Sequence, residues 1–98
     1  IAEYNQQVFL NDPENGIMIF DQFGGYIKTL PFKGVKSFQV IRNELIYLSD
    51  SSIKSYDLKR LTEREIQIPI THPPTRSFRI SDTQIYLLTN DTLNIYSF

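Results

Sequence analysis

A repeat of about 38 residues runs through the 98-residue chain, and it limits the fold to architectures built from one recurring unit. Its first element reads aliphatic, aromatic, leucine, and it occurs at residues 8–12, 46–50 and 85–89 with Phe9, Tyr47 and Tyr86 aligned. Its second element occurs at residues 17–21, 53–57 and 93–97 with Phe20, Tyr56 and Tyr96 aligned. Periods of about 20 to 50 residues are typical of solenoids, propellers and arrays.

Two further elements complete the repeat. Lys-Ser-Phe-Gln-Val at residues 36–40 matches Arg-Ser-Phe-Arg-Ile at 76–80, and an alternating segment that ends in proline occurs at 26–31 and 65–69. All four elements are short, rich in β-branched and aromatic residues, and separated by turn-forming residues, which is typical of β-strands. Each repeat therefore predicts one four-stranded antiparallel meander.

Turn-forming residues lie where such a meander needs its hairpins. Residues 11–16 and 50–52 join the second strand to the third, residues 42–44 and 81–84 join the first to the second, and Gly24-Gly25 supplies the positive φ that other residues avoid. The charged stretch 59–65 reads as a turn that enters a strand, with a single helical turn as the alternative. The pattern predicts ten strands, because only residues 1 and 2 remain where the first strand of the first repeat would end.

Consecutive four-stranded meanders of about 40 residues are typical of the blades of a β-propeller. The second strand of each repeat is nearly all apolar, as expected between neighbouring blades, and the fourth is the most polar, as expected at an outer edge. We therefore predict an all-β fold with one partial propeller domain over residues 1–98, its blades at about 1–34, 35–70 and 75–98. Because a propeller ring needs at least about four blades, we expect a fragment of a larger propeller.

Two of the repeated motifs resemble those of the NHL and YWTD-type propeller families. Residues 46–50, Ile-Tyr-Leu-Ser-Asp, look like the Tyr-x-x-Asp strand of both families, and residues 17–25 look like the NHL strand that ends in Phe-Asp with a glycine shortly after. The third repeat departs from this pattern, with Thr89 and Ser97 in place of the two aspartates. The resemblance implies a propeller of the six-bladed type.

Composition excludes several classes of protein. Ten basic and eleven acidic residues give a net charge of −1, which argues against a strongly basic nucleic-acid module. The chain has no cysteine and one histidine, so we predict no disulfide, no metal site and no cofactor. No apolar run reaches the roughly 18 residues of a membrane span. The lack of cysteine, together with many Asn, Ser, Thr and Tyr residues, favours a bacterial periplasmic, secreted or outer-surface location.

Three residues are candidates for ligand binding. Asp12 and Asp50 follow the second strand at matching positions, and His72 lies beside two prolines in the loop between two blades. For both aspartates a hydrogen bond to the residue's own turn is the simpler interpretation, as it is for Asp21 and Asp57 after the third strand, because turns recur in every repeat whereas a site is usually unique. His72 has no carboxylate or second histidine at ligand spacing, and a stiff inter-blade connection also explains the prolines.

One segment concentrates positive charge. The stretch 22–43 contains no acidic residue and holds two aromatic residues near its basic ones, which are Lys28, Lys33, Lys36 and Arg42 beside Tyr26 and Phe32. Some NHL propellers bind RNA through a basic face with exposed aromatics, which is the functional interpretation. Protection of an outer strand against foreign pairing is the simpler one, and we predict no nucleic-acid partner.

The function that these features predict is a non-catalytic binding or scaffold module, part of a β-propeller that presents loops to a protein, peptide or carbohydrate partner. Two alternatives stay open. One is a fragment of a metal-dependent propeller enzyme of the lactonase or lyase kind, to which this chain would contribute acids such as Asp12 and Asp50. The other is a self-assembling half-propeller, a homo-oligomer formed through open blade edges.

Overall fold

The computed structural model describes residues 1–49, 52–66 and 75–97, which form eleven strands and no helix. The strands are β1 (Ala2–Tyr4), β2 (Gln7–Asp12), β3 (Gly16–Asp21), β4 (Tyr26–Leu30), β5 (Val35–Ile41), β6 (Glu44–Ser49), β7 (Ser52–Asp57), β8 (Thr62–Ile66), β9 (Ser77–Ile80), β10 (Gln84–Leu88) and β11 (Leu93–Ser97). In this part of the chain, therefore, no helix is long and apolar enough to cross a membrane.

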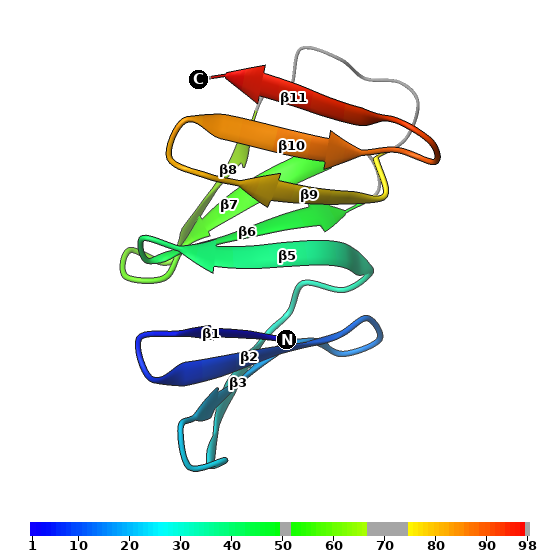
Figure 1. The fold of residues 1–98 in the computed structure, drawn as a ribbon. Coiled ribbons are helices and arrows are strands. Elements are labelled where there is room, and N and C mark those ends of the chain that lie inside the picture. Colours follow the sequence, from blue (N-terminus) through cyan, green and yellow to red (C-terminus); the bar gives the residue numbers. More distant parts are fainter. Residues whose placement is uncertain (50–51, 67–74, 98) are drawn as a thin grey trace.

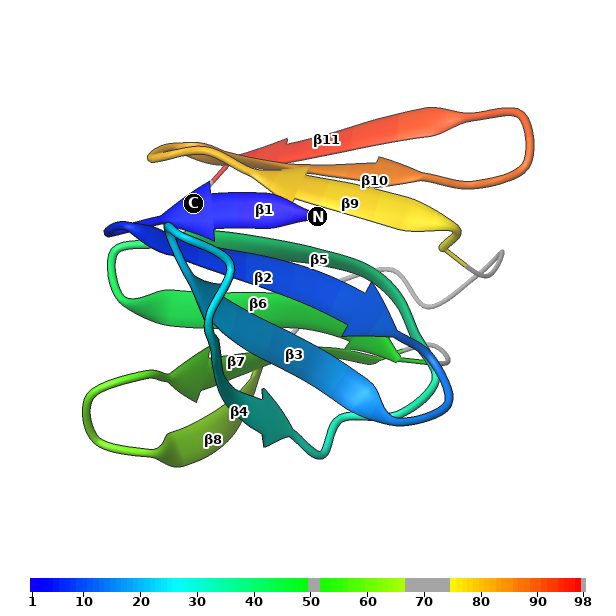
Figure 2. The same ribbon diagram turned by 90° about the horizontal axis from the view of Figure 1, so that it is seen from below.

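The strands form three antiparallel sheets in which each strand pairs with the next along the chain. The first sheet contains β1 to β4, the second β5 to β8 and the third β9 to β11. Figure 1 shows the sheets stacked one on another, and Figure 2 shows β1, β5 and β9 close together, in agreement with the contacts of β5 with both β1 and β9. The predicted all-β fold of antiparallel meander sheets is confirmed, with β1, β5 and β9 as the inner strands.

The prediction of ten strands is wrong, because the first repeat has its own inner strand. Residues Ala2–Tyr4 form β1 and pair with β2 from Ala2 opposite Phe9 to Tyr4 opposite Gln7. The two turn residues, Asn5 and Gln6, both have positive φ, 51° and 64°, which is the geometry of a tight type I′ hairpin. Three residues carry too little alternation to predict a strand, so the turn and the partner strand decide its presence.

The fourth strand of the second repeat begins earlier than predicted. We expect it at residues 65–69, whereas β8 runs from Thr62 to Ile66, and residues 67–69 lie outside the described part of the chain. The difference arises because the preceding turn is short: the Leu61 amide donates to the Asp57 carbonyl at 2.8 Å, and the strand begins at the next residue. The stretch 59–65 is thus a turn followed by a strand, as predicted.

The alignment of the second strands is wrong by one residue. The inner hairpins, which join the first strand of each sheet to the second, define the equivalent positions. The residues that close these hairpins are Tyr4 and Gln7, Ile41 and Glu44, and Ser81 and Gln84, where the Ser81 amide donates to the Gln84 carbonyl. The next residues along the second strands, Val8, Leu45 and Ile85, are therefore equivalent. The sequence alignment instead places Ile46 at the position of Val8 and Ile85. Because side chains alternate between the two faces of a strand, a shift of one residue places Phe9 and Tyr47 on opposite faces.

The middle sheet is buried on both faces, and this explains the alignment error. Leu45 and Tyr47 pack against the first sheet, whereas Ile46 and Leu48 pack against the third, and all four side chains are at most 4% exposed. A strand that is apolar on both sides has no alternation to define its register. The third strands are aligned as predicted, since Phe20, Tyr56 and Tyr96 pair with Val8, Leu45 and Ile85.

Two sheet faces have no neighbour among the described residues. The N-terminal face belongs to the first sheet and consists of Glu3, Val8, Leu10, Met18 and Phe20. The C-terminal face belongs to the third sheet and consists of Arg79, Tyr86, Leu88, Leu93 and Ile95. Leu10 is 40% exposed and Leu93 is 57% exposed, whereas their equivalents in the middle sheet, Tyr47 and Ile53, are 4% and 0% exposed.

Candidate binding cleft

The Gln39 side chain makes two hydrogen bonds between the second and third sheets, near their inner strands. Gln39 on β5 donates from Nε2 to the carbonyl of Ile80 on β9 at 2.6 Å and accepts from the Ile80 amide at 2.8 Å. Ser37 and Ser77 also lie within hydrogen-bond distance across this boundary, with 3.3 Å between their hydroxyl oxygens. The Gln39 amide therefore pairs with both backbone groups of one residue and sets the spacing of the two blades.

A cleft of about 240 Å³ opens at this boundary, at the end of the sheets where the inner hairpins turn. Its floor is made of isoleucine side chains from both sheets, and its rim carries charged and hydroxyl groups from the turns and from β8. The lining residues are Ile41, Arg42, Glu44, Ile46, Arg64, Ile66, Ile80, Ser81 and Asp82. The cleft thus combines an apolar floor with a rim of mixed charge.

Two ion pairs hold the rim. Arg42, in the turn between β5 and β6, pairs with Asp82 in the corresponding turn of the third sheet. Arg64 on β8 donates to Glu44 on β6 at 3.1 Å, and the same Glu44 oxygen accepts from the buried Ser55 hydroxyl at 2.8 Å. The Arg42 and Asp82 side chains are 62% and 83% exposed, so water screens their attraction and leaves both groups able to change partners.

A second, polar hollow of about 200 Å³ adjoins the cleft and shares Glu44 and Arg64 with it. Its remaining lining comes from β7, β8 and the turn between them, namely Ser55, Asp57, Arg60, Thr62 and Glu63. On the side of the sheet that faces β1 to β4, the buried Tyr47 hydroxyl donates to Glu63 at 2.7 Å. Burial and the hydrogen bond to this carboxylate both raise the pKa of Tyr47, so the phenol stays neutral and acts as a donor.

Asp12, the one ligand-binding candidate within the described residues, is engaged by its own turn. Its carboxylate accepts from the Glu14 amide at 3.1 Å and from the Asn15 side chain at 2.8 Å. The Asn15 and Glu14 hydrogen bonds hold the pKa of Asp12 below its ordinary value. The other two candidates, Asp50 and His72, lie outside the described residues. Asp12 belongs to the opposite end of the sheets from the cleft, and the structure does not bring it near Glu44 or Arg42.

The aspartates after the third strands have the turn role that their recurrence predicts. Asp21 accepts from the Phe23 amide at 2.9 Å and from the Gly25 amide at 2.8 Å. Asp57 accepts from the Lys59 amide at 2.9 Å and from the Arg60 amide at 3.0 Å. These hydrogen bonds order the outer turns in the first two sheets.

Replacing Asp57 by asparagine is expected to make stability less sensitive to acid. The amide bonds from Arg60 and Lys59 hold the pKa of Asp57 below its ordinary value, so its stabilisation is complete above about pH 4 and is lost as the pH falls through that lowered pKa. An asparagine oxygen accepts the same bonds without titrating. Urea unfolding near neutral pH and near pH 3 should show a smaller loss for Asp57→Asn than for the unchanged chain, and an equal loss would contradict this role for the carboxylate.

The basic stretch does not present both of its aromatic residues. Tyr26 is 61% exposed, but Phe32 is half-buried, with its ring stacked on Tyr47 at 4.6 Å between centroids and in edge contact with Tyr56 at 5.1 Å. Phe32 therefore joins the first and second sheets and is not available to stack on a base. In the part of the chain that the structure describes, no three His, Cys, Asp or Glu residues lie close enough to hold a metal ion.

The residues of the cleft do not stand out in the sequence as a site. Glu44 and Arg64 read there as a turn residue and an outer-strand charge, and a hydrogen-bond network between strands that are 20 residues apart has no sequence motif. One signal exists for the other pair. Arg42 and Asp82 are the first turn residues of consecutive inner hairpins, and opposite charges at one position of adjacent repeats predict a contact when the blades stack.

No protein-family model and no curated protein sequence matches the chain. Among solved structures, the chain is similar to Hsv2 of Kluyvelomyces marxianus, with a TM-score of 0.67 and 12% identity over 95% of this chain and 30% of that one. It is also similar to two computationally designed proteins, Ika4 and Ika8, each with a TM-score of 0.61, 13% identity and 98% of this chain covered. The chain spans 62% of Ika4 and 31% of Ika8.

These likenesses and the three stacked meanders define the chain as β-propeller blades. At 12 to 13% identity the solved structures show the fold alone. The chain covers about a third of Hsv2, so the function of a whole propeller does not transfer to it.

Proposed function

We propose that the chain is a non-catalytic binding or scaffold segment of a β-propeller, and that its partner is a protein or peptide. The observation that supports this most directly is the cleft between the second and third sheets, with its isoleucine floor and its rim of two arginines and two carboxylates. Concave sites with an apolar base and a few placed polar groups are typical of ligand binding.

The size and lining of the cleft favour one peptide side chain over a whole small molecule. Its volume of about 240 Å³ is below the roughly 300 to 1,000 Å³ of small-molecule sites. The nine lining residues include no aromatic ring that could lie against a sugar, whereas an apolar side chain flanked by charged neighbours matches the floor and the rim. Because the Arg42–Asp82 pair is exposed, either group can exchange its partner for a charge on the peptide.

The test uses ¹⁵N-labelled chain and two sets of probes. One set consists of short peptides with a central leucine or isoleucine between acidic and basic residues, and the other consists of mono- and disaccharides. Peptides are expected to shift the amide signals of Arg42, Glu44 and Ser81 and to leave the turn at Asn15 unchanged. Arg42→Glu should weaken the peptide response about tenfold, because it places like charge beside Asp82.

Asp91→Arg, a charge reversal in the exposed turn after β10, serves as the control and should leave the response unchanged. Shifts produced by the saccharides alone would replace the peptide by a carbohydrate partner. If neither set moves the cleft signals, the proposal is wrong for this cleft. The metal-dependent enzyme is a separate hypothesis, and stoichiometric metal binding would support it.

A further inference from the structure

The two open sheet faces are the two halves of an interface that the chain already makes twice. In the middle sheet, one face packs on the sheet before it and the other on the sheet after it. The N-terminal face is equivalent to the face of the middle sheet that packs on the sheet before it, since Val8 and Leu10 correspond to the buried Leu45 and Tyr47. The C-terminal face is equivalent to the face of the middle sheet that packs on the sheet after it, since Leu88 and Leu93 correspond to the buried Leu48 and Ile53.

We propose that the C-terminal face of one chain packs on the N-terminal face of a second copy, and that two copies close a ring of six sheets. The inference goes beyond the proposed function, because it concerns how the blades are completed and does not depend on the ligand of the cleft. Three sheets from each of two copies make six, which lies within the range of about four to eight blades found in propellers.

The inner strands supply a specific contact for this interface. At the boundary of the second and third sheets, Gln39 reaches the backbone of Ile80. In the alignment of the inner strands, Arg79 on β9 is equivalent to Gln39 on β5. In the same alignment, Glu3 on β1 is equivalent to Ile80 on β9. When the third sheet of one copy meets the first sheet of another in the same arrangement, Arg79 therefore lies opposite Glu3.

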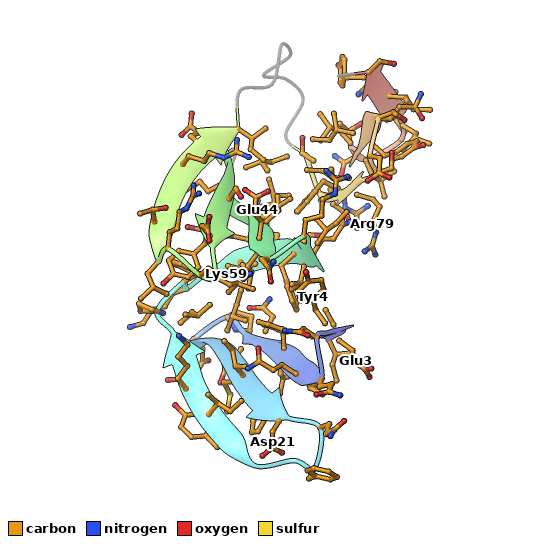
Figure 3. The ribbon with its side chains drawn as sticks, turned by 90° about the vertical axis from the view of Figure 1, so that its left-hand side faces the viewer. Glu3, Tyr4, Asp21, Glu44, Lys59 and Arg79 are labelled. Atoms are coloured by element: carbon orange, nitrogen blue, oxygen red, sulfur yellow. The ribbon has the colours of Figure 1, made fainter. Side chains whose placement is uncertain are left out.

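At the proposed contact between two copies, Arg79 and Glu3 carry opposite charges. At the boundary of the second and third sheets within one chain, the neutral amide of Gln39 lies at the position of Arg79. Arg79 and Glu3 are both exposed, and Figure 3 shows them on the same side of the molecule as Tyr4, away from Lys59. Around them both faces expose apolar side chains. Leu10 is 40% exposed on the N-terminal face, and Leu88, Leu93 and Ile95 are 44%, 57% and 51% exposed on the C-terminal face. The contact is head-to-tail, with the C-terminal face of each chain on the N-terminal face of the other. A dimer therefore contains the contact twice, closes a ring and leaves neither open face exposed.

The test is the solution mass of the 98-residue chain, measured by light scattering after size-exclusion chromatography over a series of concentrations. We expect a mass of about 23 kDa, twice the 11.5 kDa of the chain, at the higher concentrations. Glu3→Arg and Arg79→Glu should each shift the protein to the monomer mass and raise the dissociation constant at least about tenfold, because each places like charges together at both contacts.

Mixing the two variants gives the sharpest result. In a dimer of one Glu3→Arg chain with one Arg79→Glu chain, both contacts pair opposite charges again, so the equimolar mixture is expected to recover the dimer mass that neither variant shows alone. Glu14→Arg and Lys59→Glu are matched charge reversals at exposed turns, and both variants should show the same dimer mass as the chain without substitutions. Circular dichroism of each variant monitors the fold.

Three results would overturn the proposal. A chain that stays at the monomer mass at every concentration would mean that the open faces are completed by blades of a longer chain. Variants that keep the dimer mass would mean that a different surface associates. A ladder of increasing masses would mean that the head-to-tail contact forms but the ring does not close.

Discussion

Leu48→Ala is expected to lower the free energy of unfolding by about 3 kcal/mol, within the range of about 2 to 5 kcal/mol for a buried leucine. Leu48 lies on β6 and is 0% exposed, packed between the second and third sheets. The loss has two causes, the apolar surface no longer buried and the cavity left between two sheets that cannot move together freely. Urea unfolding followed by circular dichroism measures it.

Leu88 is the matched control, because it occupies the position on β10 that Leu48 occupies on β6. It is 44% exposed on the C-terminal face, so Leu88→Ala should cost less than about 1 kcal/mol when unfolding is measured below the concentration at which the proposed dimer forms. Equal losses at the two positions would contradict the assignment of the middle sheet as the only one of the three described sheets covered on both faces.

Gln39→Ala is expected to lower the free energy of unfolding by about 1 to 2 kcal/mol, because it removes two hydrogen bonds and leaves the amide and carbonyl of Ile80 without their partner. Gln22→Ala, in the exposed turn after β3, should change stability by less than about 0.5 kcal/mol. A loss no larger at Gln39 than at Gln22 would show that the amide does not join the blades.

Gln39→Glu separates the two hydrogen bonds by pH. An ionised carboxylate accepts from the Ile80 amide but repels the Ile80 carbonyl, whereas a protonated carboxyl accepts from one and donates to the other. The folded state therefore raises the pKa of this new carboxyl, and the variant's stability relative to the unchanged chain should be greatest below about pH 4 and fall as the pH rises. A relative stability that does not change with pH would contradict the paired geometry.

The strand pattern could be predicted wherever side chains alternate or turn residues repeat. The aromatic residues of the third strands predict their register correctly, and the outer turns of the first two sheets use Asp21 and Asp57 as expected. The second strands could not be aligned, because β6 is apolar on both faces and one register looks as good as the next. The three-residue β1 could not be predicted, because its presence depends on a turn with two positive φ angles.

The candidate site follows the same division. Asp12 could be assigned to its turn from local sequence, since the bonds to Glu14 and Asn15 span only two and three residues. The cleft could not be found in this way, because it forms where Arg42, Glu44 and Arg64 from the second sheet meet Asp82 from the third. Its residues become neighbours only after the blades have stacked.

Local sequence patterns are enough to predict the all-β meander, the repeat and the order of the strands, because alternation, β-branched residues and turn residues act over a few positions. The tertiary structure alone decided the faces that are buried, the cleft and the two open faces, because these depend on which sheet packs against which. Leu48 and Leu88 illustrate the difference: both are strand leucines, and only the presence of a neighbouring sheet makes one 0% and the other 44% exposed.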